Sequence, residues 1–155
     1  MKINDLIFGE LEYEYIWYKN ITIEFCGSLT EIILMINGDE DGDFEEEQYK
    51  AYNSLIEKWS DLQEDILDSI LKYYKDQRHQ LGYDIENNEK YPLIETREKL
   101  LQNITLAGIV IPYSGTYEGR ESGLTFDCTW DEENGVGVYL LDENIIEVGY
   151  QDIIL

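Results

Sequence analysis

The sequence predicts an α+β domain in which one antiparallel sheet, an N-terminal β-meander plus C-terminal hairpins, packs against one long and one short helix. Three observations support this prediction. The first third of the chain is rich in β-branched and aromatic residues, the middle repeats apolar residues at helical spacing, and the last 32 residues alternate apolar and polar side chains. Strands, then helices, then strands are the order of an α+β domain. A chain of 155 residues is expected to form a single domain over residues 1–155.

The first third is expected to form the β-meander. Strands are predicted over Leu6 to Phe8 and over Leu11 to Tyr18, where Tyr, Trp and Ile are frequent. Apolar and polar residues then alternate over Ile21 to Phe25, which is typical of a further strand. Gly27-Ser28 would turn the chain, and the β-branched run from Thr30 to Ile36 would form the next strand.

A long helix is expected over residues 44–81. Asp43 and Glu46 resemble a capping box, with Asp43 as the N-cap. Apolar residues at three- and four-residue spacing would form one stripe, which comprises Tyr52, Leu55, Ile56, Trp59, Leu62, Ile66, Leu67, Ile70 and Tyr74. A straight helix of this length would span about 57 Å. Because a compact domain of this size is only about 40 Å across, the helix is expected either to end near Lys75 or to bend.

The segment after the long helix is expected to contain a loop, a short helix and a buried strand. Residues 82–93 look like the loop, and the short helix is predicted over roughly Glu95 to Asn103. Ile104 to Tyr113 reads as a largely buried strand that Ser114-Gly115 ends.

The C-terminal block predicts antiparallel strands with one face on the core and the other in water. The apolar face would carry Leu124, Phe126, Cys128 and Trp130, and the polar face Thr125, Asp127, Thr129 and Asp131. Asn134-Gly135 suits a tight hairpin turn. Strands are expected again over residues 136–140 and 145–148, joined by a turn at residues 142–144.

The net charge of −23 restricts the classes of partner. Residues 105–155 carry ten acidic residues and a single base, Arg120, and residues 39–48 carry no base at all. Nucleic acid is a poor partner because phosphate binding needs clustered Lys and Arg, and anionic membranes are disfavoured for the same reason. A basic protein is the natural complement. The alternative is that the acidity only keeps the protein soluble.

Cysteine usage and the start of the chain indicate a cytoplasmic protein. Cys26 and Cys128 are too few for a disulfide scaffold and read as residues of a reduced compartment. The first residues, MKIND, start no signal peptide, and the longest clean apolar run, Ile32 to Ile36, is too short to span a membrane.

No pattern in the sequence indicates a catalytic residue, a cofactor or a metal. A calcium loop starting at Asp39 fails, since Phe44 stands where the turn glycine is needed and Lys50 where the bidentate Glu is needed. His79 is the only histidine and reads as a solvated residue at a helix end. One His and two separated Cys do not make a standard zinc site.

Two groups of carboxylates are candidates for binding a partner. The first comprises Asp127, Asp131, Glu132 and Glu133, and the second comprises Asp39, Glu40 and Asp41. Aromatic residues near the first group, Trp130, Tyr139 and Tyr150, are types that anchor protein interfaces, although Trp130 also suits the core. The alternatives for these acids are solvated polar turns or a carboxylate-based, metal-dependent catalytic site.

Three segments resemble a family of small uncharacterised bacterial domains of unknown function. They are FGELEYEYIW (8–17), WDEENGVGV (130–138) and VGYQDIIL (148–155), and the last two carry the specific signature. Members of that family often have His where this chain has Asn134, which argues against a catalytic His at that turn. The resemblance implies an α+β cytosolic domain with no established enzyme activity. Similar small acidic proteins are found as immunity factors beside bacterial toxins, so the resemblance also suggests toxin immunity.

Charge and resemblance together lead to an expected function that is not enzymatic. The leading hypothesis is an acidic protein-binding domain, in its most concrete form an immunity-type protein that occludes a basic toxin. The alternatives are a general interaction or scaffold domain with another partner, and a carboxylate-based metal enzyme. The sequence leaves the oligomeric state, the partner's identity and the exposed sheet face open.

Overall fold

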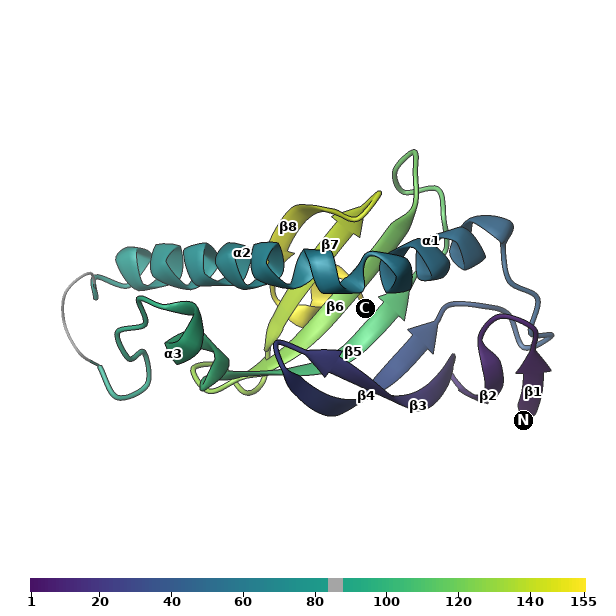
Figure 1. Cartoon of the computed structure of the whole chain (residues 1–155), viewed down its shortest axis with the longest axis horizontal. Helices are drawn as coiled ribbons and strands as arrows, with labels where there is room; N and C mark the ends of the chain where they lie inside the picture. Colours follow the sequence, from purple (N-terminus) through teal and green to yellow (C-terminus); the bar gives the residue numbers. More distant parts are fainter. Residues whose placement is uncertain (84–87) are drawn as a thin grey trace.

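The computed structural model describes residues 1–83 and 88–155, and within them eight strands form one sheet in sequence order (Figure 1). The strands are β1 (Lys2–Asp5), β2 (Gly9–Glu14), β3 (Ile16–Phe25), β4 (Ser28–Ile36), β5 (Ile104–Ile111), β6 (Glu121–Cys128), β7 (Val136–Leu141) and β8 (Asn144–Gly149). All neighbouring strands are antiparallel except β4 and β5, which are parallel. The α+β class is therefore confirmed, but the expectation of a purely antiparallel sheet is wrong at its centre.

The predicted long helix is two helices, α1 (Glu46–Glu57) and α2 (Trp59–Gln80), which continue one another as a rod across the sheet (Figure 1). Lys58, with φ −95° and ψ 3°, interrupts the rod, and α2 continues to Gln80, so of the two expected alternatives the end near Lys75 is wrong. The N-cap is also two residues later than predicted. Glu45 takes this position in place of Asp43, and the Gln48 side-chain oxygen accepts a hydrogen bond from the Glu45 N–H at 2.9 Å.

The short helix α3 (Arg97–Leu101) confirms the second predicted helix in a shorter form. Thr96 caps it, because the Thr96 hydroxyl oxygen accepts from the Lys99 N–H at 3.1 Å. Arg97 ties α3 to α2 through two hydrogen bonds of 2.7 Å to the Asp68 carboxylate. Of the loop predicted over 82–93, residues 84–87 lie outside the described part of the chain.

The parallel pair needs a connection that returns the chain from the end of β4 to the start of β5, and α1, α2 and α3 make it. The helices lie over one face of the sheet, which we call the helix face (Figure 1). The apolar stripe of the rod, except Ile56, which is exposed, packs there against strand residues such as Trp17, Leu34 and Ile109. The rings of Tyr74 and Trp130, with centroids 4.4 Å apart, join α2 to the turn after β6. Burial on the helix face is therefore the main apolar contact of the domain.

The N-terminal strands differ from their predicted bounds. The segment Leu6 to Phe8 is a turn that leaves Leu6 fully exposed and buries Phe8. The strand predicted over Leu11 to Tyr18 is broken at Tyr15, whose φ of 68° reverses the chain between β2 and β3. Residues other than glycine rarely adopt this φ. The composition of the segment therefore gave no indication of a turn at Tyr15.

The opposite face of the sheet, which we call the outer face, is only partly in water. The C-terminal segment, residues 150–155, lies across this face and packs Ile154 with Val110 and Tyr139. Glycines make room for it: a Cβ on Gly123 would lie 1.7 Å from Ile154 Cγ1, and one on Gly137 2.5 Å from the Tyr150 carbonyl oxygen. The predicted polar face of β6 is consequently buried at Thr125, whereas Asp127 is exposed as predicted.

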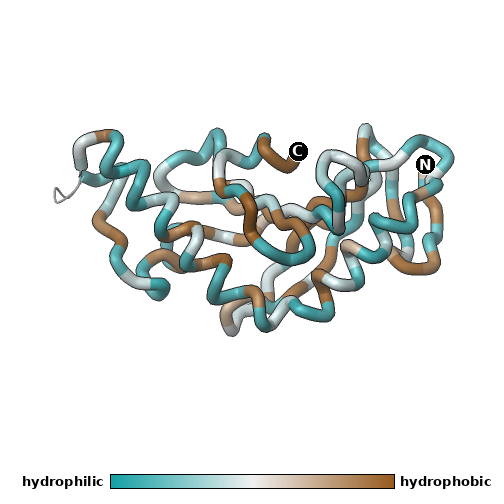
Figure 2. Tube along the Cα trace, turned by 90° about the horizontal axis from the view of Figure 1, so that it is seen from above, coloured by the Kyte–Doolittle hydropathy of each residue, from teal (hydrophilic) through white to brown (hydrophobic). Residues whose placement is uncertain are grey.

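Hydrophobic residues follow the strands and the C-terminal segment, and hydrophilic residues are frequent along the helix rod (Figure 2). The edges of the sheet are β1 and β8. Within the described residues, we find no helix that combines the length and apolarity needed to cross a bilayer.

Replacing Gly123 with Ala should destabilise the fold by about 2 kcal/mol, because the new methyl group overlaps Ile154. Urea unfolding would measure this loss. In a Gly123→Ala/Ile154→Ala double variant the cost should be smaller than the sum of the single costs, since the shorter side chain frees the space. If the losses in the free energy of unfolding were strictly additive, the Ile154 side chain would not be the group that requires a glycine at position 123.

Candidate functional site

The first predicted group of carboxylates includes the turn between β6 and β7. Asp131 is used by the turn itself, since its carboxylate accepts hydrogen bonds from the Asn134 backbone N–H at 3.2 Å and side-chain amide at 3.0 Å. Glu132 and Glu133 are exposed, and neither forms an ion pair within residues 1–83 and 88–155. These two side chains therefore carry the charge that the turn presents to solvent.

Asp127 lies near the end of β6 on the outer face. An open groove runs beside it between the start of β5 and the end of β6, and its lining residues are Gln102, Asn103, Thr105, Asp127, Cys128, Thr129 and Glu132. The Thr129 hydroxyl donates to the Asn103 side-chain oxygen at 2.7 Å, so part of this polar lining is already paired. Asp127 and Glu132 are the carboxylates of the groove.

The second predicted group, Asp39, Glu40 and Asp41, follows the end of β4. The Asp39 carbonyl oxygen accepts from the Trp17 indole N–H at 2.7 Å, and its carboxylate accepts from the Tyr113 hydroxyl at 3.2 Å. Asp41 accepts from the Asp43 N–H at 3.2 Å. Glu40 is exposed, and the described part of the chain offers it no ion pair.

The structure does not bring the two groups together. Residues 39–41 follow Ile36, which pairs with Ile111 at the end of β5. Residues 131–133 follow Cys128, which pairs with Ile104 at the start of β5. The eight residues of β5 separate the groups by about 26 Å, at roughly 3.3 Å per residue. They are two acidic surfaces at opposite ends of the sheet.

The most strongly perturbed carboxylate belongs to neither group. Glu143, in the turn between β7 and β8, is 5% exposed and has a φ of 62°. Its Oε1 accepts from Ser54 Oγ at 2.9 Å, Lys58 Nζ at 2.8 Å and Arg120 Nη2 at 2.9 Å, and its Oε2 accepts from Arg120 Nε at 3.0 Å. A carboxylate accepts about four hydrogen bonds. Glu143 is therefore saturated by the protein and has no site left for a ligand.

These contacts set the protonation state of Glu143. Burial by itself would raise the pKa of the carboxyl group, but the hydrogen bonds from Arg120, Lys58 and Ser54, with the charge of Arg120, together lower the pKa to about 2. Glu143 thus remains ionised over the physiological range. Its role is to join the C-terminal hairpin to α1 and to Lys58 between the helices.

Sequence reasoning missed the Glu143 centre, although one signal pointed to it. Arg120 is the single base in residues 105–155, and a lone arginine among ten acids is expected to have a fixed partner. A second buried acid, Glu121, was also missed. It accepts hydrogen bonds from the Tyr139 hydroxyl and from the Gly115 N–H, and burial together with this carboxylate raises the pKa of Tyr139.

The two cysteine thiols are not activated as nucleophiles. Burial raises the pKa of the Cys128 thiol to about 11 and also raises the pKa of Cys26, so both thiols are protonated at neutral pH. His79 is exposed in the last turn of α2, as expected for a residue at a helix end. No group of three or more His, Cys, Asp or Glu among the described residues is placed to hold a metal ion.

A family model described as a domain of unknown function, DUF6985, matches residues 7–155. The chain belongs to this family. No curated protein and no solved structure matches the chain. The DUF6985 match covers both acidic surfaces, the Glu143 centre and the glycines beneath the C-terminal segment. Membership confirms the resemblance to an uncharacterised domain family.

Replacing Glu143 with Gln should lower the free energy of unfolding at pH 7 by about 3 kcal/mol, which corresponds to the shift of the pKa from 4.5 to about 2. A carboxyl whose folded pKa is lowered stabilises the fold above its unfolded pKa. The difference between wild type and variant should therefore shrink as the pH falls from about 4.5 towards 2. Urea unfolding as a function of pH would measure this difference in the free energy of unfolding.

Glu147→Gln is the matched control, because Glu147 is exposed on the neighbouring strand and forms no ion pair among the described residues. It should change stability by less than about 0.5 kcal/mol at any pH. An equal loss in both variants would mean that net charge, and not the Glu143 contacts, determines the effect.

Proposed function

We propose that this DUF6985 member is an acidic protein-binding domain whose partner is a basic protein. In its most concrete form it is a cytoplasmic immunity-type protein of a bacterium, which neutralises a toxin by covering the toxin's basic surface. The alternative within the same class is a scaffold domain that binds a basic partner with no toxic activity. Both forms require exposed negative charge that the fold itself does not use.

The exposed, unpaired carboxylates are the observation that carries the proposal. Glu40, Glu132 and Glu133 are exposed, and the described residues provide no basic partner for them. Arg120, the only base in residues 105–155, is committed to Glu143 and Asp142. A basic protein surface would supply the missing counter-charges and would be drawn to the domain by its net charge of −23.

Charge reversal at the β6–β7 turn tests the proposal. Glu132→Lys/Glu133→Lys should slow association with the basic partner about tenfold and weaken binding, because both charges face solvent. The partner would first be isolated by a pull-down at low salt and elution in a salt gradient. Association rates would then be measured with the purified pair at several ionic strengths.

The control variant, Glu57→Lys/Asp65→Lys, changes the net charge equally on exposed positions of the helices. It should slow association less than the turn variant does. Equal effects would show that only net charge matters and would remove the turn from the contact. If the partner is a toxin, production of the domain should restore growth to cells that make the toxin; a scaffold domain would give no protection.

A further inference from the structure

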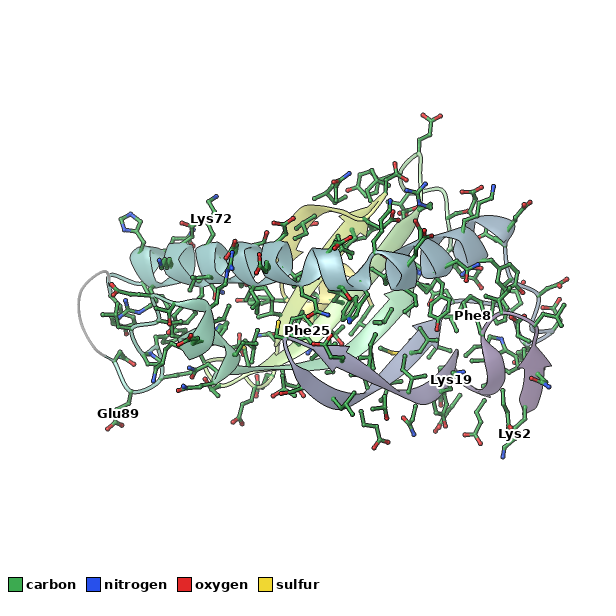
Figure 3. All side chains as sticks on the ribbon, viewed as in Figure 1. Lys2, Phe8, Lys19, Phe25, Lys72 and Glu89 are labelled. Carbon is green, nitrogen blue, oxygen red and sulfur yellow. The ribbon has the colours of Figure 1, made fainter. Side chains whose placement is uncertain are left out.

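The outer face of the sheet is divided into two halves. Over β5 to β7, the C-terminal segment lies on the strands, where Ile154 is buried against Val110 and Tyr139. Over β2 to β4, no segment of the described chain covers the strands on this face, because the helices lie on the other side (Figures 1 and 3). We call this second half the open half-sheet.

The open half-sheet exposes apolar side chains in a regular row. Leu29 and Ile33 alternate along β4 with residues that point to the helix face, and Met35 continues their side of the strand but is half-buried against the covered cluster of Val110, Tyr139 and Ile154. Leu29 is 79% exposed and Ile33 is 43% exposed, although both belong to a well-paired strand. Tyr18 lies opposite Met35 on β3 and extends the row towards β2. An exposed apolar row of this kind on a sheet is typical of a protein contact surface.

Carboxylates surround the apolar row. Glu10, Glu12 and Glu14 lie along β2 on the same face, and Glu31 stands between Leu29 and Ile33 on β4. Lys2 lies opposite Glu12 on β1, is paired with it at 3.3 Å and points away from the helix rod (Figure 3). Within residues 1–83 and 88–155, no ion pair neutralises Glu10, Glu14 or Glu31.

Charge decides what can cover this surface. A second copy of the chain would bring an equal charge of −23 against it, and nucleic acids or anionic membranes would be repelled in the same way. The complementary surface is a protein surface that carries Lys or Arg around apolar side chains. We propose that the open half-sheet is the docking surface for the basic protein partner, an inference that rests on the proposed function and specifies where the partner binds.

The regularity of the surface suits this role. The strands β3 and β4 have 10 and 9 residues, which is about 30 Å, and the three strands from β2 to β4 span about 14 Å at about 4.8 Å per strand. This footprint is about half of the roughly 800 Å² that each partner contributes to a standard interface. The β3–β4 pairing runs from Trp17–Ile36 to Phe25–Ser28 without a bulge. A surface that is already ordered loses little conformational entropy on binding.

Two synthetic peptides test the inference with the intact domain. One alternates Lys and Leu, and the other alternates Lys and Ser with the same charge; binding is measured by calorimetry and the contact surface by hydrogen exchange. The Lys–Leu peptide should bind at least about tenfold more tightly than the Lys–Ser peptide, since it alone covers the apolar row. Its protection should fall on β3 and β4.

The variant Leu29→Ser/Ile33→Ser removes the apolar row at constant charge, and exposed side chains can be replaced with little effect on folding. It should weaken binding of the Lys–Leu peptide about tenfold and leave the Lys–Ser peptide unchanged. The control Leu81→Ser/Leu93→Ser alters two similarly exposed leucines outside the sheet, with exposures of 50% and 40%, and should bind both peptides like the wild type.

The outcomes separate the two proposals. If the Lys–Leu peptide binds but protects residues 39–41 or 131–133 without protecting β3 and β4, and the Leu29→Ser/Ile33→Ser variant binds it normally, the open half-sheet is not the docking surface and the proposed function stands. If neither peptide binds at low salt, the proposed function fails. A second copy of the chain is the remaining possible occupant of this surface, and sedimentation of the free domain would detect it as a dimer. A dimer that the Leu29→Ser/Ile33→Ser variant abolishes would make this surface a self-interface and overturn the inference.

Discussion

The parallel pairing of β4 with β5 is the constraint on which the arrangement of the other elements depends. A parallel neighbour cannot be reached by a hairpin, so the chain must travel the length of the sheet before β5 begins. The helix rod makes this passage on one face, and its apolar stripe then covers that face from end to end. The opposite face receives no α-helix, only a short 3-10 helix, Gln151–Ile153, of the C-terminal segment. It is left to the C-terminal segment and, over β2 to β4, to solvent.

The acids of this chain serve two different purposes. Glu143 and Glu121 are buried, and each is matched by specific donors, which is the condition for an ionised or polar group to remain inside a protein. Some exposed acids also make contacts within the fold, such as Asp68 with Arg97, but Glu40, Glu132 and Glu133 form no ion pair among the described residues. This separation is the reason to connect the exposed acids with a partner and the buried ones with stability.

The course of the chain was largely predictable from periodicity. Helical spacing located the rod, and alternation located the strands of the C-terminal block, because both patterns follow from burying one face of an element. The turn at residues 142–144 was predicted, but its positive φ at Glu143 and the contacts of that side chain were not. The turn at Tyr15 was missed, because a tyrosine with positive φ carries no turn signal in the sequence.

The sequence placed the two acidic groups in exposed turns. The distance between the groups depends on strand order, which local sequence patterns do not reveal. The break at Lys58 and the burial of Thr125 were missed for a similar reason. Thr125 is buried because the C-terminal segment covers the face that holds it, and Lys58, at the break, contacts Glu143, which is distant in sequence. The exposure of Ile33 was likewise not apparent in the sequence, where Ile33 lies within the apolar β-branched run from Thr30 to Ile36.

The two open edges of the sheet give the net charge a further consequence. β1 and β8 present unpaired backbone groups, and unprotected edges of this kind allow sheets of separate molecules to join. Mutual repulsion between molecules of charge −23 opposes such joining at neutral pH. Near the isoelectric point of about 4.1 that repulsion vanishes while Glu143 still holds the β7–β8 hairpin in place. Mild acid should therefore precipitate folded molecules before it unfolds them, and the precipitate should redissolve when the pH is restored.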